Sequence, residues 1–393
     1  MSLRASRSAA VALVTFATFT DIVAYSVAVP VLPDLSRKLG ASPTMIGLLF
    51  ASFGVTLLTV SIPMGAVSDR VGRKAPMVSG LLALAASTLL FAYSDGLPWL
   101  FAARLVQGAA DAITWVVGFA LIADRYGPEE RGRVTGFVMS GTSAAVMVGP
   151  TIGGWLYELG GIRAPFLMVS ALAVAGALGF LWLEIPSARE TAEPVPIRVV
   201  LRSRAVAVCT LVVVAISATI SMFEPVLPLY LNAKLGLGPA RIGMIFGCSA
   251  VASAILHPIY GRLADRWGGG RLMIAGLAAA ACVVPLMNLT WSYPSTIMFS
   301  VFNTMAIAMV ITPSLAYMAE SVSDAGVGSF GVGYGLYNMA WGAGLLCGPA
   351  LAGFIFERAG FARLTLIWAP ALLVVTLLLA RVQSPTPPNL EHL

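Results

Sequence analysis

The sequence predicts an all-α membrane protein with twelve transmembrane helices in two pseudo-symmetric six-helix bundles. Three observations predict it: the composition, twelve apolar stretches of spanning length and an internal repeat. Of the 393 residues, 58% are hydrophobic and only 11% are charged, less than half the roughly 25% found in soluble domains. So little charge cannot cover the surface of soluble domains, which excludes a cytosolic enzyme, a disordered chain and a small secreted scaffold.

The apolar stretches give the expected helices. About 20 mostly apolar residues are needed to cross the hydrocarbon core of a bilayer. Stretches of this kind occur at about 9–33, 43–64, 76–93, 99–123, 134–157, 164–184, 205–231, 240–262, 271–290, 295–318, 329–356 and 362–381. Backbone polar groups must be paired within lipid, and the sequence lacks the period-two alternation of a membrane barrel, so the spans are expected to be helices.

The placement of Lys and Arg predicts the orientation. With both termini in the cytoplasm, the inner segments carry more than twice as many of these residues as the outer loops. This bias is typical of cytoplasmic loops. We therefore expect an integral protein of the cell (inner) membrane with the lipid bilayer as its partner. The net charge of +6 is explained by these loops, and no nucleic-acid partner is expected.

A repeat divides the chain into two halves. The polar stretch 185–204 contains three prolines and mixed charge, and it predicts a cytoplasmic linker between an N-terminal bundle, 1–184, and a C-terminal bundle, 205–393. Three motifs recur 195 to 199 residues later: Gly65…Asp69-Arg70 as Gly261…Asp265-Arg266, Pro30-Val-Leu-Pro33 as Pro225-Val-Leu-Pro228, and Gly149-Pro150…Glu158 as Gly348-Pro349…Glu357. Duplicated six-helix halves of this kind are typical of secondary transporters.

These motifs resemble those of the major facilitator superfamily over nearly the whole chain. The loop from Gly65 to Lys74 matches the signature between helices two and three, and Arg104-Leu-Val-Gln107-Gly108 resembles the motif of proton-coupled members. A fifth-span motif has the spacing of drug:proton antiporters, which implies export: Gly136, Ala145 (in place of a usual Gly), Gly149, Pro150 and Gly153.

Within this branch the chain resembles the vesicular monoamine transporters and their bacterial homologues. Phe19-Thr-Asp21 resembles their first helix and Phe223-Glu224-Pro225 their seventh. The resemblance places Asp21 and Glu224 at an amine-binding and a proton-linked carboxylate. Three further charged positions of that family fall on Phe53, Ile311 and Asn338, and a broader multidrug efflux role fits their loss better.

Ionisable residues within the spans are the candidate proton-coupling groups, because such groups are costly in lipid. They are Asp21, Glu224, Asp111 and Arg104. A carboxylate that alternately holds a proton or an organic cation is sufficient for antiport, since both compete for one charge. Arg104 lies on the same helical stripe as Asp111, and two partners are open for it, Asp111 through water or Asp21. Pro225 is expected to break the helix beside Glu224. The alternative is that each acid has a structural role and takes no part in proton coupling.

Aromatic and polar residues near these acids are the candidate substrate-binding groups, since aromatic rings attract organic cations. With the two carboxylates, the set is Asp21, Glu224, Tyr25, Trp115, Phe119, Phe223, Tyr337, Asn338 and Trp341. The alternative for any single ring is packing.

The repeated loop and Gly-Pro motifs are the candidate gating elements. Their residues are Asp69, Arg70, Arg73, Gly149, Pro150, Asp265 and Arg266. Charges near helix ends are expected to latch the two halves in the outward-facing state. Glycine and proline allow close helix approach and bending, although close packing alone is the alternative.

The expected function is proton-coupled antiport that exports small lipophilic or cationic compounds, such as drugs or amines, by alternating access. The sequence contains no phosphate-binding loop of the G-x-x-x-x-G-K-[ST] type and no metal-ligand spacing, so we expect neither an enzyme nor a cofactor, with the proton gradient as energy source. A monomer is expected. The alternatives are an importer or facilitator of another small solute and, less favoured, a non-transporting membrane sensor.

Overall fold

The computed structural model describes residues 7–185, 203–324 and 330–383, which form helices joined by short connections. The first half contains α1 (Arg7–Ser26), η2 (Val29–Val31), α2 (Leu32–Leu39), α3 (Pro43–Val71), α4 (Lys74–Tyr93), α5 (Leu97–Arg125), α6 (Pro128–Gly160) and α7 (Arg163–Trp182). The second half contains α9 (Arg204–Leu235), α10 (Pro239–Trp267), α11 (Gly269–Leu286), η3 (Met287–Leu289), α12 (Tyr293–Asp324) and α13 (Phe330–Gln383). The described part of the chain holds no strand.

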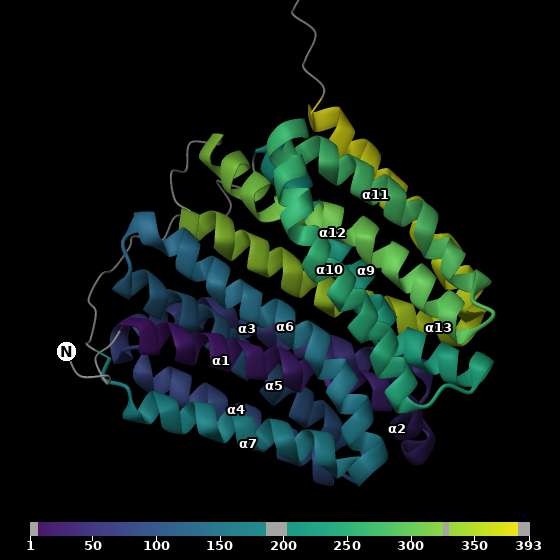
Figure 1. Ribbon diagram of the computed structural model, residues 1–393, viewed down its shortest axis with the longest axis horizontal. Coiled ribbons are helices and arrows are strands. Elements are labelled where there is room, and N and C mark those ends of the chain that lie inside the picture. The colour runs from purple at the N-terminus through teal and green to yellow at the C-terminus, as the bar shows by residue number, and fades with distance from the viewer. Residues whose placement is uncertain (1–6, 186–202, 325–329, 384–393) are drawn as a thin grey trace, which may run out of the picture.

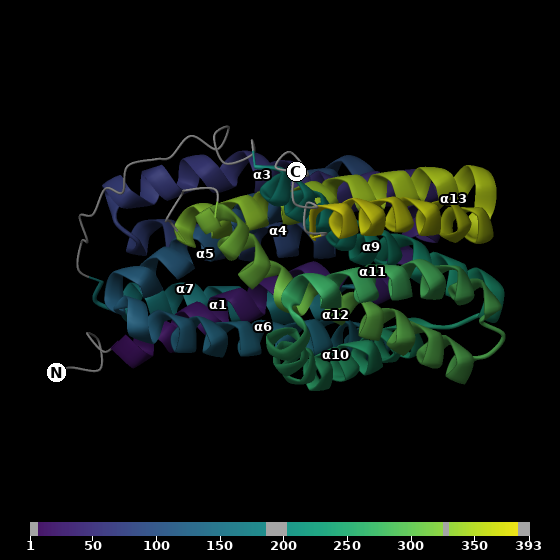
Figure 2. The same cartoon turned by 90° about the horizontal axis from the view of Figure 1, so that it is seen from above.

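The helices account for all the expected spans: α1, η2 and α2 together form the first, and α13 forms the last two. Ten helical stretches among the described residues are long and apolar enough to cross a membrane. Helix α13 bends at Gly360, whose φ is 78°, and Figure 2 shows the two arms that result, olive to yellow. Together with α6, the second arm of α13 completes the correspondence with twelve spans, so the predicted all-helical membrane fold is confirmed.

Prolines interrupt the helices differently from the expectation. Helix α9 continues through Pro225 and Pro228, so the predicted break beside Glu224 is wrong. A proline inside a membrane helix is tolerated when neighbouring groups satisfy the freed backbone. The interruption comes instead in the first span, where α1 ends and the short turn η2 carries Pro30 before α2 begins.

The two sets of helices meet along two crossings. Figure 1 shows α1 to α7, purple to teal, at the lower left, and most of α9 to α13, green to yellow, at the upper right. Helix α13 packs along α3, and α10 packs along α6. Residues 186–202 of the expected linker lie outside the described residues, so the domain division at 185–204 stays a prediction.

The repeat recurs in the geometry of these crossings. At the α3–α13 crossing, Gly47 lies against the carbonyl of Pro349, and at the α6–α10 crossing Gly243 lies against the carbonyl of Pro150. A Cβ atom at either glycine would overlap the opposite backbone. Small residues that let helix backbones approach closely are typical of membrane helix interfaces. The Gly-Pro motifs therefore pack the two halves against each other.

We call the end of the molecule that contains Leu39, Gly160 and Gly360 the outer end, because the charge distribution predicts that it faces away from the cytoplasm. The opposite end is the inner end. Helices α2 and α9 both finish at the outer end on a glycine in the left-handed conformation, Gly40 (φ 60°) and Gly236 (φ 63°). The positive φ is a conformation that glycine adopts without steric cost. These two glycines also occupy equivalent positions of the repeat.

Candidate functional site

A buried acid in α1 forms the first part of the site. Asp21 is only 1% exposed. Its Oδ2 accepts hydrogen bonds from Trp115 Nε1 at 3.1 Å and Thr114 Oγ1 at 3.4 Å, both on α5. Its Oδ1 receives no N–H or O–H group among the described residues. Asp21 is therefore oriented from one side and left without a donor on the other.

A second acid lies directly against it. Asp111, on α5, is 8% exposed, and its carboxyl group lies within hydrogen-bonding contact of Asp21. Two carboxylates in contact repel each other, so a buried pair is stabilised when it shares a proton. A shared proton also supplies the donor that Asp21 lacks. We call Asp21 and Asp111 the acid pair.

Arg104 lies among aromatic rings and uncharged polar groups. Its side chain is fully buried, and its Nη1 donates to Gln107 Oε1 at 2.8 Å and to the Tyr25 carbonyl at 3.4 Å. The guanidinium carbon lies 4.1 Å from the ring centre of Phe50 and 5.4 Å from that of Phe91. Within the described part of the chain Arg104 forms no ion pair, so a direct pairing with Asp21 is absent, whereas the pairing with Asp111 through water stays a prediction. Cation–π contacts on aromatic rings take the place of a carboxylate.

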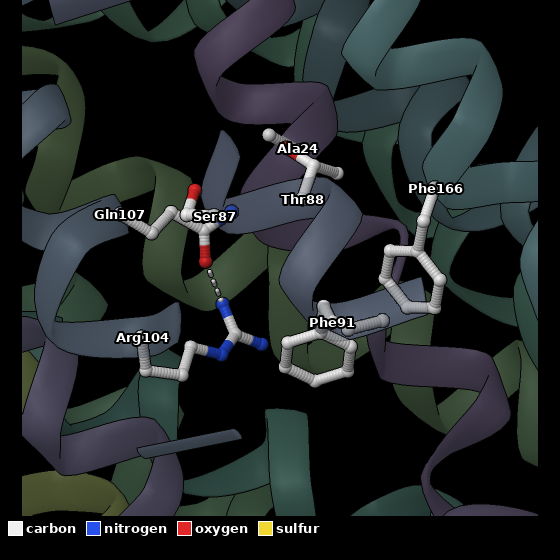
Figure 3. A pocket seen from close by; sticks show the side chains of 8 residues that line it. Ala24, Ser87, Thr88, Phe91, Arg104, Gln107 and Phe166 are labelled. Atoms are coloured by element: carbon white, nitrogen blue, oxygen red, sulfur yellow. Dashed lines mark hydrogen bonds between the residues drawn. The ribbon is translucent and has the colours of Figure 1, made fainter. Parts of the chain in front are cut away.

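Figure 3 shows a recess beside Arg104, lined by side chains of α1, α4, α5 and α7 that include Ala24, Ser87, Thr88 and Phe166. The recess is too narrow to admit a water molecule. The recess is therefore a narrow gap between packed helices and is no candidate for a substrate-binding site.

The third acid connects the two halves. Glu224, on α9, is partly buried, and its Oε2 accepts a hydrogen bond from the hydroxyl of Tyr25 on α1. Arg104 attracts Glu224 over a longer distance. Tyr25 lies about one helical turn after Asp21, and its ring centre is 4.8 Å from that of Phe53. The acid pair and the contact between Tyr25 and Glu224 are therefore about one helical turn apart along α1.

The remaining substrate candidates fall into two groups. Trp115 packs against Phe119 with the two rings tilted (5.6 Å between ring centres) next to Asp21. On α13, Tyr337 stacks with Trp341 (6.2 Å) and bonds to Ser314 of α12. Asn338 is half-buried on the same helix. Phe223, by contrast, is 5% exposed and packs against Phe361, an arrangement that favours the packing alternative for this ring.

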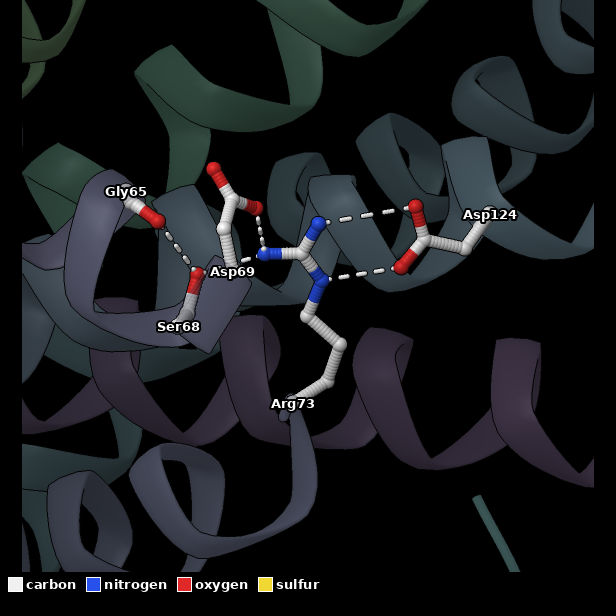
Figure 4. A network of polar contacts seen from close by, with 5 residues as sticks. All are labelled: Gly65, Ser68, Asp69, Arg73 and Asp124. Carbon is white, nitrogen blue, oxygen red and sulfur yellow. Dashed lines mark hydrogen bonds and ion pairs between the residues drawn. The ribbon is translucent and has the colours of Figure 1, made fainter. Parts of the chain in front are cut away.

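The candidate gating charges form a network at the inner end of the first half, which Figure 4 shows. Arg73 Nε donates to Asp124 Oδ2 at 2.8 Å, and its Nη1 lies 2.5 Å from Asp69 Oδ1 and 2.6 Å from Ser68 Oγ. Burial lowers the pKa of the Arg73 guanidinium, but Asp124 and Asp69 outweigh burial, so its pKa is raised. The network ties α3 and α4 to α5.

The other gating candidates are placed separately. Arg70, Asp265 and Arg266 have exposed side chains at the inner end, whereas Gly149 lies against Ser26 of α1. The gating role of the whole set stays a prediction.

Sequence reasoning missed several residues of the site. Thr114 and Gln107 position Asp21 and Arg104, and Asp124 pairs with Arg73 across 51 positions of the chain. Gln107 lies three residues after Arg104 on α5, so their spacing was a signal that they share a helix face. Thr114 and Asp124 contact partners on other helices, and such contacts have no spacing signal in the sequence.

Comparison with known proteins agrees with this geometry. The family model of the Major Facilitator Superfamily matches residues 14–329 and 208–392. The "Probable vesicular acetylcholine transporter-B" of Danio rerio is 28% identical over 388 residues, which cover 92% of this chain and 78% of the relative. The human vesicular acetylcholine transporter is 31% identical over 349 residues, with 84% and 65% covered. The rat synaptic vesicular amine transporter is 27% identical over 332 residues, with 84% and 64% covered. The chain thus spans just under two thirds of the length of the latter two.

Solved structures show the same fold. A bacterial homologue of the human lysosomal transporter Spinster, inward-facing and occupied, matches with a TM-score of 0.80 at 14% identity, covering 97% of this chain and 99% of that one. The human organic anion transporter MFSD10 matches with a TM-score of 0.70 at 20% identity, covering 95% and 99%. The predicted resemblance to vesicular amine transporters is confirmed, and with a family model that matches most of its length, this chain belongs to the Major Facilitator Superfamily of membrane transporters, which are not enzymes.

Proposed function

We propose that this protein is a proton-coupled antiporter that exports small lipophilic or cationic compounds, amines and drugs among them, by alternating access. The observation that carries the proposal is the acid pair, a buried pair of carboxyl groups with no cation in contact among the described residues. Ionisable groups inside a membrane are costly, so those that occur there mark ion or substrate pathways. Relatives named as acetylcholine and amine transporters support a cationic substrate.

The charges around the site favour a cation as well. Among the described residues, the site combines three carboxyl groups, Asp21, Asp111 and Glu224, with one guanidinium, that of Arg104. Arg104 attracts Glu224, which leaves the acid pair without a compensating charge. At the position where the resemblance places a lysine, Phe53 packs against Tyr25 instead. The site therefore combines excess negative charge with aromatic walls, which attract organic cations.

The exchange follows from competition for one charge. A proton shared by the acid pair leaves toward the cytoplasm, and the ionised pair then binds an organic cation that enters from the inner end. After the halves rock and open outward, protons from outside displace the cation. Glu224 is the second protonatable group, and its bond to Tyr25 connects it to the helix that carries Asp21.

Proteoliposomes with an imposed pH gradient test the proposal. Amines and lipophilic cations are added, with an uncharged analogue of each, and dissipation of the gradient is recorded. We expect cation-evoked proton flux in the parent protein and its loss in Asp21→Asn and Asp111→Asn. Asp95→Asn is the matched control, because Asp95 is an exposed acid in the loop between α4 and α5. Cation uptake without proton flux contradicts antiport and favours a facilitator, and binding without uptake favours a sensor.

The proposal includes the setting of the protein. We place a monomer in the cell (inner) membrane with both termini in the cytoplasm, and with the proton gradient as its energy source and no cofactor. The unequal distribution of Lys and Arg supports this orientation.

A further inference from the structure

Two glutamates at the outer end bridge the two halves. Glu158, near the end of α6, accepts a hydrogen bond through Oε1 from the backbone N–H of Ala240 at 3.1 Å, in the first turn of α10. Glu357, just before the bend of α13, accepts one through Oε2 from the backbone N–H of Thr44 at 2.9 Å, in the first turn of α3. Each carboxylate therefore caps the N-terminus of a helix that belongs to the opposite half.

The two contacts are copies of each other. Glu158 and Glu357 occupy equivalent positions of the repeat, each eight residues after the proline of a Gly-Pro motif. Their partners Ala240 and Thr44 are equivalent as well, and each directly follows a proline at the first helical position. The same contact has therefore been built twice from the same duplicated elements.

A glycine one turn before each glutamate brings the backbones together. Gly154 lies against the carbonyl of Pro239, and Gly353 lies against the carbonyl of Pro43. Positions four apart share one face of a helix, so glycine and glutamate approach the opposite helix start together. The glycine permits the close approach, and the glutamate supplies the polar bond at its edge.

The chemistry of helix ends explains why a carboxylate is suited to this place. The first turn of a helix has backbone N–H groups without an intrahelical acceptor. The helix dipole adds partial positive charge there, and a carboxylate is stabilised beside it. Both glutamates are exposed at the outer end, where water can replace the contact when it breaks. A hydrogen bond from a backbone N–H group to an exposed carboxylate can favour the closed outer end, and it can still break during the transport cycle.

We propose that Glu158 and Glu357 are positioning residues of the transport cycle, which fasten the outer ends of the two halves and must release together before the outer end opens. The inference rests on the alternating access of the proposed function. In the arrangement described here both contacts are closed, one at each crossing. Neither glutamate touches the acid pair or Glu224, so they act on access to the site and not on the bound substrate.

Cysteine accessibility from outside tests the inference without any substrate or gradient. The reporter is Thr151→Cys on α6, because the Thr151 side chain is half-buried under α10, 3.4 Å from the carbonyl of Gly243. Serine replaces Cys248, Cys282 and Cys347, and the buried Cys209 stays. A membrane-impermeant maleimide is applied from the outer side, and the initial labelling rate is measured.

We expect Glu158→Ala and Glu357→Ala each to raise the labelling rate roughly threefold, and the double variant roughly tenfold, since each removes one helix-end contact. Glu158→Gln and Glu357→Gln should label more slowly than the alanine variants, because an amide oxygen still accepts the backbone bond. Asp95→Ala, which removes an exposed outer acid elsewhere, should label at the parent rate.

Two results overturn the inference: labelling of the double variant at the parent rate, or an equal rise in Asp95→Ala. Thermal unfolding and elution volume in detergent check that each variant is folded, and the single variants carry the test if the double variant is unstable. The labelling experiment measures no transport. Absence of proton flux in proteoliposomes therefore contradicts the proposed function, but the labelling rates still test the role of Glu158 and Glu357.

Discussion

At the scale of single residues, the hydroxyl of Tyr25 links helix α1 directly to Glu224 of the other half. It donates to Glu224 across the interface, while its ring packs on Phe53 and faces Arg104 at 5.2 Å. A charged carboxylate accepts a stronger hydrogen bond than a neutral one. The strength of this link between α1 and α9 therefore depends on whether Glu224 holds a proton.

The substitution Tyr25→Phe removes the hydroxyl and keeps the ring, so it isolates the contribution of the hydroxyl. The ring contacts remain, so we expect a folded protein in which proton-driven transport falls about tenfold, because a bond to a charged group is lost. Its dependence on pH should also change, since Glu224 loses its hydrogen-bond donor. Transport rates across a pH series in proteoliposomes check this. Tyr230→Phe is the control, because Tyr230 bonds to Lys234 of its own helix. An unaltered pH profile would contradict the assigned role of the hydroxyl.

The sequence predicted the acids of the site better than their partners. Asp21, Asp111 and Glu224 were identified because a carboxyl group inside an apolar span is rare and costly. The sequence left Arg104 open between two acids, yet it lies on aromatic rings, and a contact between helices far apart in the chain has no sequence signal. For the same reason the contact between Asp21 and Asp111 emerged only from the packing of α1 on α5.

At the scale of elements, the glycines of the crossings decide how closely α3 and α13 approach. The Gly-Pro motif predicted close packing, and the structure places Gly47 against the Pro349 carbonyl. The helix breaks were less predictable. A proline removes one hydrogen bond wherever it lies, but α9 continues through Pro225 while the first span is interrupted at Pro30. The surrounding helices decide which proline is accommodated.

Gly47→Ala tests the crossing. The added methyl group overlaps backbone on the opposite helix, so we expect the free energy of unfolding to fall by about 1–3 kcal/mol. Thermal unfolding in detergent measures the change. Gly136→Ala is the control, because open space surrounds Gly136 on α6 and alanine is the better helix former. Equal stability of the Gly47 variant and the parent would show that the crossing is looser than described.

At the scale of the whole molecule, duplication explains the architecture. The two crossings, the paired glutamates and the left-handed glycines all recur at equivalent positions of the two halves. The twelve spans and the repeat were predictable because span length and motif recurrence are read directly from the order of residues along the chain. The pairing of α3 with α13 and of α6 with α10 was not, because it depends on how one half docks on the other.

If each half is a folding unit, a chain divided in the predicted linker should reassemble. We expect residues 1–190 and 191–393, co-expressed as separate chains, to copurify and to restore proton-driven transport, because the crossings supply packed contacts without the covalent connection. Division within α9, between Val214 and Ala215, is the control, since it interrupts a helix that packs along α13. Copurification is measured with a tag on one fragment. If the linker-divided fragments fail to associate while the undivided chain is stable, the two halves depend on their covalent connection, and the predicted domain division loses its physical meaning.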